Sequence, residues 1–287
     1  MVQVGADIQR IVILTHGDAD VARDPLGRCL AFLRARDVEV LAPPAEWEKH
    51  GQVLAAAGCG RLSGAAGLEG VGLCLVLGGD GTMLRAFHLT RDRSIPVAGV
   101  NLGRVGFLTT VDKHEVEVGL AALLAGGFTE YPLLGLEARI GSELFVASND
   151  VVVGRGKRPR ACSLGLTING VTLFAVLCDG VVVGTPAGSS AYSLAAGGPL
   201  LGISVDAYVI SLVAPHAVGV RPVVAAPGDI LEIINTDYAE AAVDVDGERV
   251  AAVKPGDVVR INTIPGMTTL ALLNGDSLYH HFRDRLL

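Results

Sequence analysis

The chain has 287 residues, of which 50% are hydrophobic and 18% charged, with 37 glycines and 13 prolines. A half-apolar chain of this length can bury a large core, which excludes intrinsic disorder, and its glycines follow no Gly-X-Y period, which excludes collagen. The 30 acidic and 23 basic side chains give a formal charge of −7, which argues against a general affinity for nucleic acid or anionic membranes.

No uncharged apolar run reaches the roughly 18 residues that a membrane-spanning helix needs. The most apolar stretch, residues 203–234, is interrupted by prolines and charged residues. The chain begins MVQVGADIQR, without the basic and apolar regions of a secretory signal, and its 5 cysteines are scattered without a Cys-x-x-Cys pair. We therefore expect a cytoplasmic protein with reduced thiols, small-molecule partners and no membrane or nucleic-acid partner.

Short apolar runs alternate with helical patterns from residue 10 to about residue 126. The pattern predicts strands over 11–14, 38–41, 73–77 and 96–100, and helices over 21–36, 83–91 and 115–124. The Gly- and Ala-rich stretch 55–72 is open between a flexible connection and a weak helix. Alternating strands and helices imply a mostly parallel sheet, so we expect a Rossmann-like α/β domain over residues 1–130.

After about Asn149 the pattern changes to short strands separated by turns. Strands are predicted over 164–168, 171–177, 181–183, 208–213, 230–235, 241–245, 258–264 and 269–273, with turns at 169–170, 227–228, 246–247, 255–256 and 265–266. This spacing is typical of a β-sandwich, which we place at residues 131–275. The fold class is thus α/β plus all-β. The charged, amphipathic segment 276–287 is expected to return as a helix onto the first domain.

The sharpest chemical feature is the run Leu-Gly-Gly-Asp-Gly-Thr at residues 77–82, between a predicted buried strand and a predicted helix. Its glycines let the backbone approach a ligand, and the start of the helix presents unpaired N–H groups to a phosphate. Because open α/β sheets bind ligands at the carboxyl ends of their strands, Asp80 could accept the proton of a hydroxyl that attacks a phosphoryl group. A plain strand-to-helix turn with Asp80 as N-cap is the alternative.

Two further stretches could line the same site. Residues 101–109 follow the next strand and should lie at the same edge of the sheet, with Phe107 and Leu108 in the core. Residues 179–199 combine Gly, Ser and Ala with a single Tyr192 and almost no charge. They can offer hydrogen bonds and an aromatic face to a nucleoside, although the same composition suits a tightly packed helix start at 189–196.

The three stretches, in this order and at these separations, closely resemble the NAD kinase family. The matching motifs are Gly-Gly-Asp-Gly-Thr at 78–82, Asn-Leu-Gly-x-x-Gly-Phe-Leu at 101–108 and Asp-Gly-x-x-x-x-Thr-Pro-x-Gly-Ser-x-Ala-Tyr-Ser at 179–193. The first motif is shared with phosphofructokinases and diacylglycerol kinases and identifies only a superfamily. The long third motif is far more specific, and the resemblance extends over about residues 73–224.

The resemblance implies phosphorylation of the adenosine 2′-hydroxyl of NAD by ATP or polyphosphate, with a divalent metal ion such as Mg²⁺ or Mn²⁺, to give NADP. It implies a homodimer or homotetramer, and it assigns no metal ligand. Asp80 would be the catalytic proton acceptor. The substrate-binding residues would be Gly79, Gly81 and Thr82 around the phosphates, Asn149 and Asp150 on nucleoside hydroxyls, and Asp179, Thr185, Ser190, Ala191, Tyr192 and Ser193 along the dinucleotide.

Several of these residues have a plainer interpretation. Arg160 either supplies a cation to the ligand or is one of the solvated charges of residues 155–160. By itself, Asn149-Asp150 is typical of a strand end, and Asp179 of a hairpin turn. Residues 246–248 are similar to a family turn near the site, but they are also typical of an ordinary β-turn.

Four positions depart from the family pattern. Asp150 stands where the family usually has Glu, Gly184 where it has Ser, Ala187 where it has Ser or Thr, and Leu177 where it often has a basic residue. These departures remove hydrogen-bond partners, and a lost hydrogen bond to a polar substrate costs about 1–3 kcal/mol. The phosphoryl acceptor could therefore be NAD or another nucleoside or nucleotide.

Two further functions stay open beside the kinase. One is a non-catalytic dinucleotide-binding regulator, against which the intact Asp80 argues, because binding alone needs no base. The other is a lipid kinase, which fits least, since the sequence has no amphipathic or basic membrane-docking element.

Overall fold

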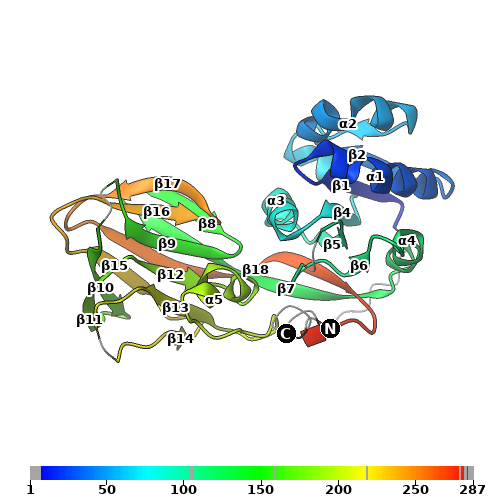
Figure 1. The fold of residues 1–287 in the computed structure, drawn as a ribbon. Helices are drawn as coiled ribbons and strands as arrows, with labels where there is room; N and C mark the ends of the chain where they lie inside the picture. The colour runs from blue at the N-terminus through cyan, green and yellow to red at the C-terminus, as the bar shows by residue number, and fades with distance from the viewer. Residues whose placement is uncertain are drawn as a thin grey trace. The chain divides into compact units, whose positions relative to one another are not determined.

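The computed structural model describes residues 8–103, 106–157, 160–217, 219–277, 279–280 and 283, with the Ala65 side chain left out. The chain forms two compact units (Figure 1): Met1–Pro132 together with Thr268–Leu287, called unit 1, and Leu133–Met267, called unit 2. The expected mixed fold, with a parallel and an antiparallel part, is confirmed. Most of segment 276–287 lies outside the described residues, so its return as a helix stays a prediction, as do the domain boundaries.

Unit 1 is built on a parallel sheet with the strand order β5-β4-β1-β2-β3, and β6 pairs with β5. The residues of β4 are all buried, and those of β1 nearly so, as strands covered on both faces require. The strands are β1 (Arg10–Thr15), β2 (Glu39–Ala42), β3 (Gly60–Arg61), β4 (Leu73–Gly78), β5 (Pro96–Asn101) and β6 (Val111–Asp112).

Helices lie on both sides of this sheet (Figure 1). Apolar residues of α1 (Ala19–Arg34) and α4 (Val116–Leu124) join Leu73 and Leu75 of β4 in one buried cluster. Since side chains alternate along a strand, Cys74 and Val76 point to the opposite face, where α3 (Asp80–Thr90) packs on β4 and β5. None of the described helices is both long and apolar enough to cross a membrane.

The predicted strands and helices of this unit are confirmed, but the sequence missed α2 (Pro44–Ala56). Only Glu46, His50 and Leu54 of this helix are buried. Because two of the three are polar, the helix lacks the apolar period that would have revealed it. The open stretch 55–72 contains β3 and one 3-10 turn, Ala65–Leu68.

Unit 2 consists of two antiparallel sheets whose facing apolar residues form a shared core. The first has the order β11-β10-β15-β18 and contains β10 (Cys162–Ile168), β11 (Val171–Cys178), β15 (Leu231–Asn235) and the start of β18 (Val258–Leu273). The second has the order β14-β13-β12-β9-β16-β17 and contains β9 (Asp150–Arg155), β12 (Gly180–Gly184), β13 (Tyr208–Val213), β14 (Val223–Ala225), β16 (Ala241–Val245) and β17 (Glu248–Val253).

The β-sandwich expected for this half is therefore confirmed, with one wrong turn and several missed strands. The turn predicted at 265–266 is wrong, because β18 is one strand that pairs with β15 as far as Ile261 and with β5 from Thr269. Besides β9, β14 and β17, the sequence missed β7 (Phe128–Ile140) and β8 (Glu143–Ala147), which form an antiparallel hairpin.

Two predicted Gly turns have the backbone geometry of tight hairpins. Asn169 and Gly170 have φ values of 50° and 79°, and Asp246 and Gly247 have 49° and 85°. Positive φ at both central residues is what a two-residue type I′ turn requires, and Asn-Gly and Asp-Gly adopt it most readily. The second of these turns places Asp246 close to the predicted nucleoside-binding residues.

Candidate functional site

The junction of β4 and α3 positions Asp80. β4 ends at Gly78 and α3 begins at Asp80, so Gly79 is the N-cap, and no side chain caps this helix. The alternative in which the Asp80 side chain is the N-cap is therefore wrong. A Cβ at Gly78 would lie 2.4 Å from the Thr82 Oγ1, whereas Cβ atoms at Gly79 and Gly81 would meet nothing within 4 Å. The first turn of α3 thus presents open backbone at the carboxyl end of β4.

The Asp80 carboxylate joins the two Gly-containing loops of unit 1. Its two oxygens accept hydrogen bonds from the backbone N–H groups of Phe107 and Leu108, each at 3.1 Å. A Cβ at Gly106 would come 2.9 Å from Asp80 Oδ1, so this approach requires Gly. Phe107 and Leu108 are buried, as expected, while residues 104 and 105 of this loop lie outside the described part. The expected meeting of the two loops at one sheet edge is confirmed.

A buried ion cluster, which the sequence did not reveal, lies at the end of the neighbouring strand. The Glu46 side chain, on α2, is 1% exposed, and its carboxylate pairs with Lys49 and Arg85, each at 2.8 Å. Thr15, the last residue of β1, donates its hydroxyl to the same carboxylate at 2.5 Å. His50 lies against this hydroxyl at 3.1 Å. No local sequence signal marks these residues, because their partners come from three different elements.

In unit 2, a single carboxylate holds the predicted Asn149-Asp150 pair. Asp246 accepts the backbone N–H groups of Ser148 at 2.8 Å, Asn149 at 2.7 Å and Asp150 at 3.1 Å. The Asp246 N–H donates in return to the Asp150 carbonyl at 3.0 Å. Asp246 is thus more than the residue of an ordinary turn: it fixes the backbone that carries both predicted nucleoside-binding side chains.

The polar groups of this pair are unusual for buried groups. The Asn149 Oδ1 is buried and has no hydrogen-bond partner among the described residues. Asp150 is 5% exposed. Burial, followed by the nearby carboxylates of Asp246 and Asp244, raises the pKa of Asp150 to about 7. An unpaired acceptor beside a carboxyl group with a raised pKa is typical of a ligand site.

Replacing Asp150 with Asn tests this environment. Because the folded-state pKa lies above the unfolded value, protonated Asp150 favours the folded state at low pH, and this contribution is lost as the pH rises through about 7. Between pH 5 and pH 8 the wild-type free energy of unfolding should therefore fall by about 3 kcal/mol more than that of the variant. Urea unfolding at both pH values measures the difference, and parallel pH profiles would contradict it.

The loop after β12 interlocks with the same backbone. Thr185, fully buried, donates its N–H to the Asn149 carbonyl at 2.9 Å and its hydroxyl to the Ser148 carbonyl at 2.7 Å, and it accepts the Gly188 N–H at 3.0 Å. A Cβ at Gly188 would lie 2.0 Å from the Asn149 carbonyl oxygen, so only Gly fits. The structure therefore brings Thr185 together with Asn149 and Asp150, as a framework residue.

The following residues differ in what they can offer a ligand. Ser193 is fully buried and its hydroxyl bonds to that of Ser211 at 2.8 Å, while the Ser190 hydroxyl donates to the Ala187 carbonyl at 3.2 Å. Ala191 is exposed, and the Tyr192 side chain, at the start of α5 (Tyr192–Ala195), is 45% exposed. Tyr192 can therefore present its ring to a ligand, whereas Ser193 serves packing.

Arg160 and Asp179 are engaged with other partners. Arg160 pairs with Asp237 at 2.9 Å and stacks over the Tyr238 ring, 3.9 Å from its centroid. Asp179 lies between β11 and β12 and pairs with Arg155 at 3.4 Å. Neither of these contacts brings Arg160 or Asp179 to Asn149.

The structure shows what surrounds three of the positions that depart from the family pattern. A Cβ at Gly184 would lie 3.2 Å from Val209 Cγ1 and 3.4 Å from Ser193 Cβ, so a side chain there would press on its neighbours. Ala187 is buried, and Leu177 is exposed on β11. The absence of a side chain at Gly184 is therefore accounted for by packing in this chain.

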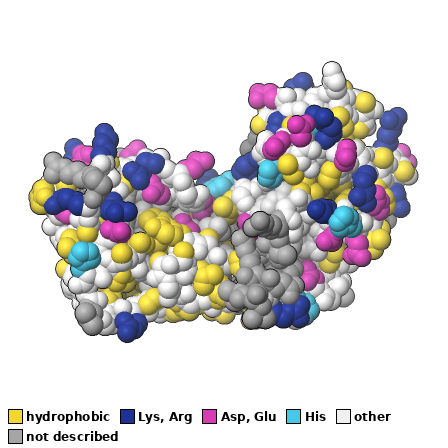
Figure 2. Space-filling view, in the orientation of Figure 1, with side chains coloured by type: hydrophobic (Ala, Val, Ile, Leu, Met, Phe, Trp, Pro, Cys, Tyr) yellow, Lys and Arg dark blue, Asp and Glu magenta, His cyan; other side chains and the backbone are white. Residues whose placement is uncertain are grey.

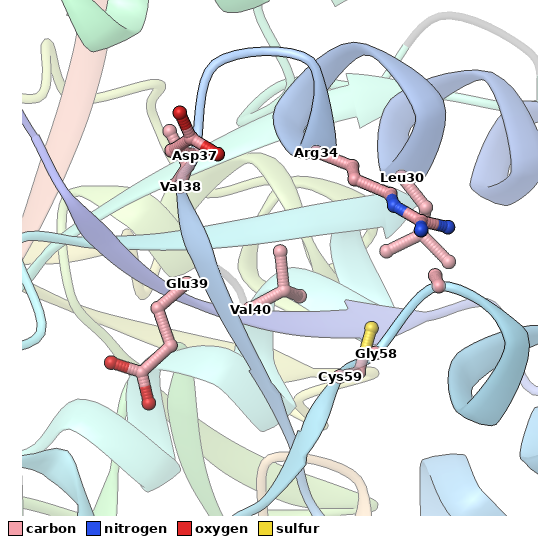
Figure 3. Close-up of a pocket in the computed structure, with 9 residues that line it drawn as sticks. Leu30, Arg34, Asp37, Val38, Glu39, Val40, Gly58 and Cys59 are labelled. Atoms are coloured by element: carbon pink, nitrogen blue, oxygen red, sulfur yellow. The ribbon is translucent and has the colours of Figure 1, made fainter.

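The hollow shown in Figure 3 is not lined by any of the predicted site residues. Within the described ranges, no three His, Cys, Asp or Glu side chains are grouped to hold a metal ion. The hollow, of about 250 Å³, is lined by Leu30 and Arg34 of α1, residues 37–40, and Ala57, Gly58 and Cys59. Since Glu39 pairs with Arg10, the first residue of β1, this hollow lies at the amino edge of the sheet, away from Asp80.

Surface charge does not single out a site either. Acidic and basic side chains are interspersed on the face that Figure 2 shows. The candidate site is therefore defined by the contacts within each unit.

Two family models match the chain. One, described as the ATP-NAD kinase N-terminal domain, matches residues 66–128, and the other, the ATP-NAD kinase C-terminal domain, matches residues 148–271. A protein named NAD kinase from Aromatoleum aromaticum is 32% identical over 268 residues, which are 90% of this chain and 87% of that protein. A protein of the same name from Chromohalobacter salexigens is 33% identical and covers 92% of both chains.

Solved structures share the fold. A yeast NADH kinase complexed with NADH superposes with a TM-score of 0.87 at 21% identity, over 98% of this chain and 88% of that one. An NAD kinase from Archaeoglobus fulgidus in complex with ATP gives a TM-score of 0.69 at 24% identity, over 96% and 97% of the two chains.

Proposed function

The chain belongs to the NAD kinase family, and from this membership we propose that it transfers the terminal phosphoryl group of ATP to the adenosine 2′-hydroxyl of NAD. The observation that carries the proposal is the setting of Asp80. It stands in the first turn of α3, between glycines that leave the backbone open, at the carboxyl edge of a parallel sheet. This is where open α/β sheets bind phosphate-bearing ligands.

In the proposed reaction, the 2′-hydroxyl oxygen of NAD attacks the terminal phosphorus of ATP. Asp80 accepts the proton of this hydroxyl. The new O–P bond forms while the bond to the leaving ADP breaks, so that NADP, ADP and one proton result. The hydrogen bonds from Phe107 and Leu108 fix the orientation of the Asp80 carboxylate. The first-turn N–H groups of α3, near Gly79, Gly81 and Thr82, would stabilise the charge on the transferring phosphoryl group.

Unit 2 supplies groups suited to the acceptor. The unpaired Asn149 Oδ1 can accept a hydrogen bond from a ribose hydroxyl, and the neighbouring Asp150 carboxyl can exchange one with a second hydroxyl. Tyr192 can stack its exposed ring on a base or the nicotinamide. Thr185 and Ser193 would support these groups, and Ser190 and Ala191 would line the same loop.

The metal ion would arrive with the donor. Mg²⁺ usually keeps several waters and binds substrate phosphates together with one or two carboxylates. We propose that the triphosphate itself supplies most of the ligands of this ion. Such an ion neutralises charge on the phosphates.

The chain is further proposed to act in the cytoplasm as a homodimer or homotetramer. The edge strand β11 supports association, because it exposes Val171, Leu173 and Leu177, which are 65%, 40% and 43% exposed. An apolar stripe on an edge strand favours contact with another copy. Sedimentation velocity measures the number of subunits.

A coupled assay tests the reaction. Purified protein is incubated with NAD, ATP and Mg²⁺, and NADP is detected with an NADP-specific dehydrogenase; NADH, adenosine and polyphosphate are tested in parallel. NADP formation supports the proposal. Phosphorylation of a nucleoside but not of NAD would mean that the phosphoryl acceptor is a nucleoside and not NAD. NAD binding without transfer from any donor would mean a regulator.

A further inference from the structure

The buried ion cluster of unit 1 has no role in the reaction as derived above. It comprises Thr15, Glu46, Lys49, His50 and Arg85, from β1, α2 and α3. Glu46 is 1% exposed and serves two cations. Burial and the neighbouring Lys49 lower the pKa of the His50 imidazole, which favours its neutral form. The buried Glu46 carboxylate therefore pairs with Lys49, whose side chain is 19% exposed, and with Arg85, which reaches the surface; burying the carboxylate has a desolvation cost that an apolar side chain would not incur.

The cluster lies beside the proposed phosphate site. In the register of the sheet, Thr15 of β1 pairs with Leu77 of β4, and the His16 N–H donates to the Leu77 carbonyl at 2.7 Å. Leu77 leads directly through Gly78 and Gly79 into the first turn of α3. The carboxyl end of β1 and the start of α3 are thus adjacent on one sheet edge.

Arg85 is the cation of the cluster that α3 itself carries. It follows Gly81 by four residues, so the two lie on the same face of α3, and helical side chains lean towards the amino end. A Cβ at Gly81 would meet nothing within 4 Å, so the space ahead of Arg85 is not filled there. Arg85 is 44% exposed, and its Nη2 donates to Glu46 at 2.8 Å.

Lys49 is bound differently. Its ammonium contacts the Thr15 carbonyl, the Thr15 hydroxyl, the His16 carbonyl and the Glu46 carboxylate, at 3.2, 2.8, 3.0 and 2.8 Å. An ammonium has three protons, so these four acceptors use all of them. A guanidinium has five N–H groups, and Arg85 commits one to Glu46. Arg85 can therefore bind phosphate oxygens while Glu46 still holds it.

We propose that Arg85 binds the phosphate chain of ATP above the first turn of α3, and that Glu46 is the positioning residue that aims it there. This inference rests on the proposed function, because it places the donor at that turn. The planar fork of a guanidinium matches two phosphate oxygens at once. The ion pair with the buried Glu46 limits the rotamers of the Arg85 side chain before ATP binds. This lowers the entropic cost of ATP binding.

The first test is steady-state kinetics of Arg85→Met. The KM for ATP should rise about tenfold to hundredfold, the worth of a hydrogen bond between charged groups, while the KM for NAD stays within about twofold. Arg85→Lys should recover part of the loss. Arg91→Met is the matched control, since Arg91 follows α3 directly, is 41% exposed and pairs with Asp92. An unchanged KM for ATP, or an equal rise in both KM values, would overturn the proposal.

The positioning role of Glu46 is tested by a double-mutant cycle. Glu46→Gln should raise the KM for ATP in the wild-type background and have little effect on it in the Arg85→Met background, because Glu46 acts through Arg85. Additive effects on the KM would overturn this role. Thermal unfolding of each variant separates such effects from general destabilisation.

Calorimetric binding of a non-hydrolysable ATP analogue with Mg²⁺ separates this inference from the proposed function. If wild type forms no NADP, the proposed function fails. The inference still holds if Arg85→Met weakens analogue binding about tenfold or more, and it fails if the analogue binds both proteins equally.

Discussion

Replacing Asp80 with Asn should lower kcat for NADP formation by about 10²–10⁴-fold, the usual contribution of a general base. Asn has the shape of Asp but cannot take up the proton of the attacking hydroxyl. Its amide oxygen can still accept one of the two backbone N–H bonds that Asp80 makes with Phe107 and Leu108. The loop should therefore stay in place at a cost of about 1–3 kcal/mol. The coupled assay measures kcat, and urea unfolding measures the cost.

Asp92→Asn provides the control, since it makes the same chemical change at a residue two positions beyond α3 whose side chain is 72% exposed. Its kcat should equal that of wild type. If Asp80→Asn keeps most of its activity, Asp80 is not the base. If it loses NAD binding together with turnover, Asp80 is a structural link between the two loops.

The sheet edge of unit 1 could be predicted because its signals are local. β4 is a continuous apolar run bounded by Gly, and the run that follows it has a helical pattern, so both elements and their junction follow from the sequence. Parallel strands end at one edge, which placed residues 78–82 and 101–109 together. The hydrogen bonds of Asp80 to that second loop could not be predicted, since they depend on the curvature of the loop.

Residues whose partners are distant in the sequence escaped prediction. Glu46 bonds to Thr15 and Arg85, which are 31 and 39 positions away, and its own helix has too few apolar positions to be recognised. Similarly, residues 265–266 look like a turn locally, but they lie inside β18, which pairs with β15 as far as Ile261 and with β5 from Thr269. In both cases tertiary contacts override the local pattern.

Asp246 is the largest discrepancy at the site. The sequence shows an Asp-Gly turn, which type I′ geometry explains without any function. The three N–H groups that its carboxylate accepts belong to residues 96 to 98 positions earlier. Only the pairing of β16 with β9 brings them together, and no pattern in either segment encodes that pairing.

Replacing Asp246 with Asn should therefore raise the KM for NAD at least about tenfold and lower the free energy of unfolding by about 2–4 kcal/mol. Asn-Gly adopts the same turn, so the change is confined to the carboxylate. In the variant, one of the two carboxylate oxygens becomes an NH₂ group, which cannot accept a hydrogen bond. At least one of the backbone N–H groups that Asp246 accepts, such as that of Ser148, is then left unpaired. The backbone of Asn149 and Asp150 then loses its fixed position.

Asp206→Asn is the matched control, at an exposed aspartate of unit 2, and should change neither quantity. Asp246→Asn also alters Asp150, whose pKa is raised in part by the Asp246 charge; removing that charge should lower the Asp150 pKa. The KM for ATP should stay unchanged, because Asp246 holds the backbone of the proposed acceptor-binding residues Asn149 and Asp150. If Asp246→Asn loses stability but keeps the KM for NAD, then Asn149 and Asp150 do not bind the acceptor, and its hydroxyls must be held elsewhere.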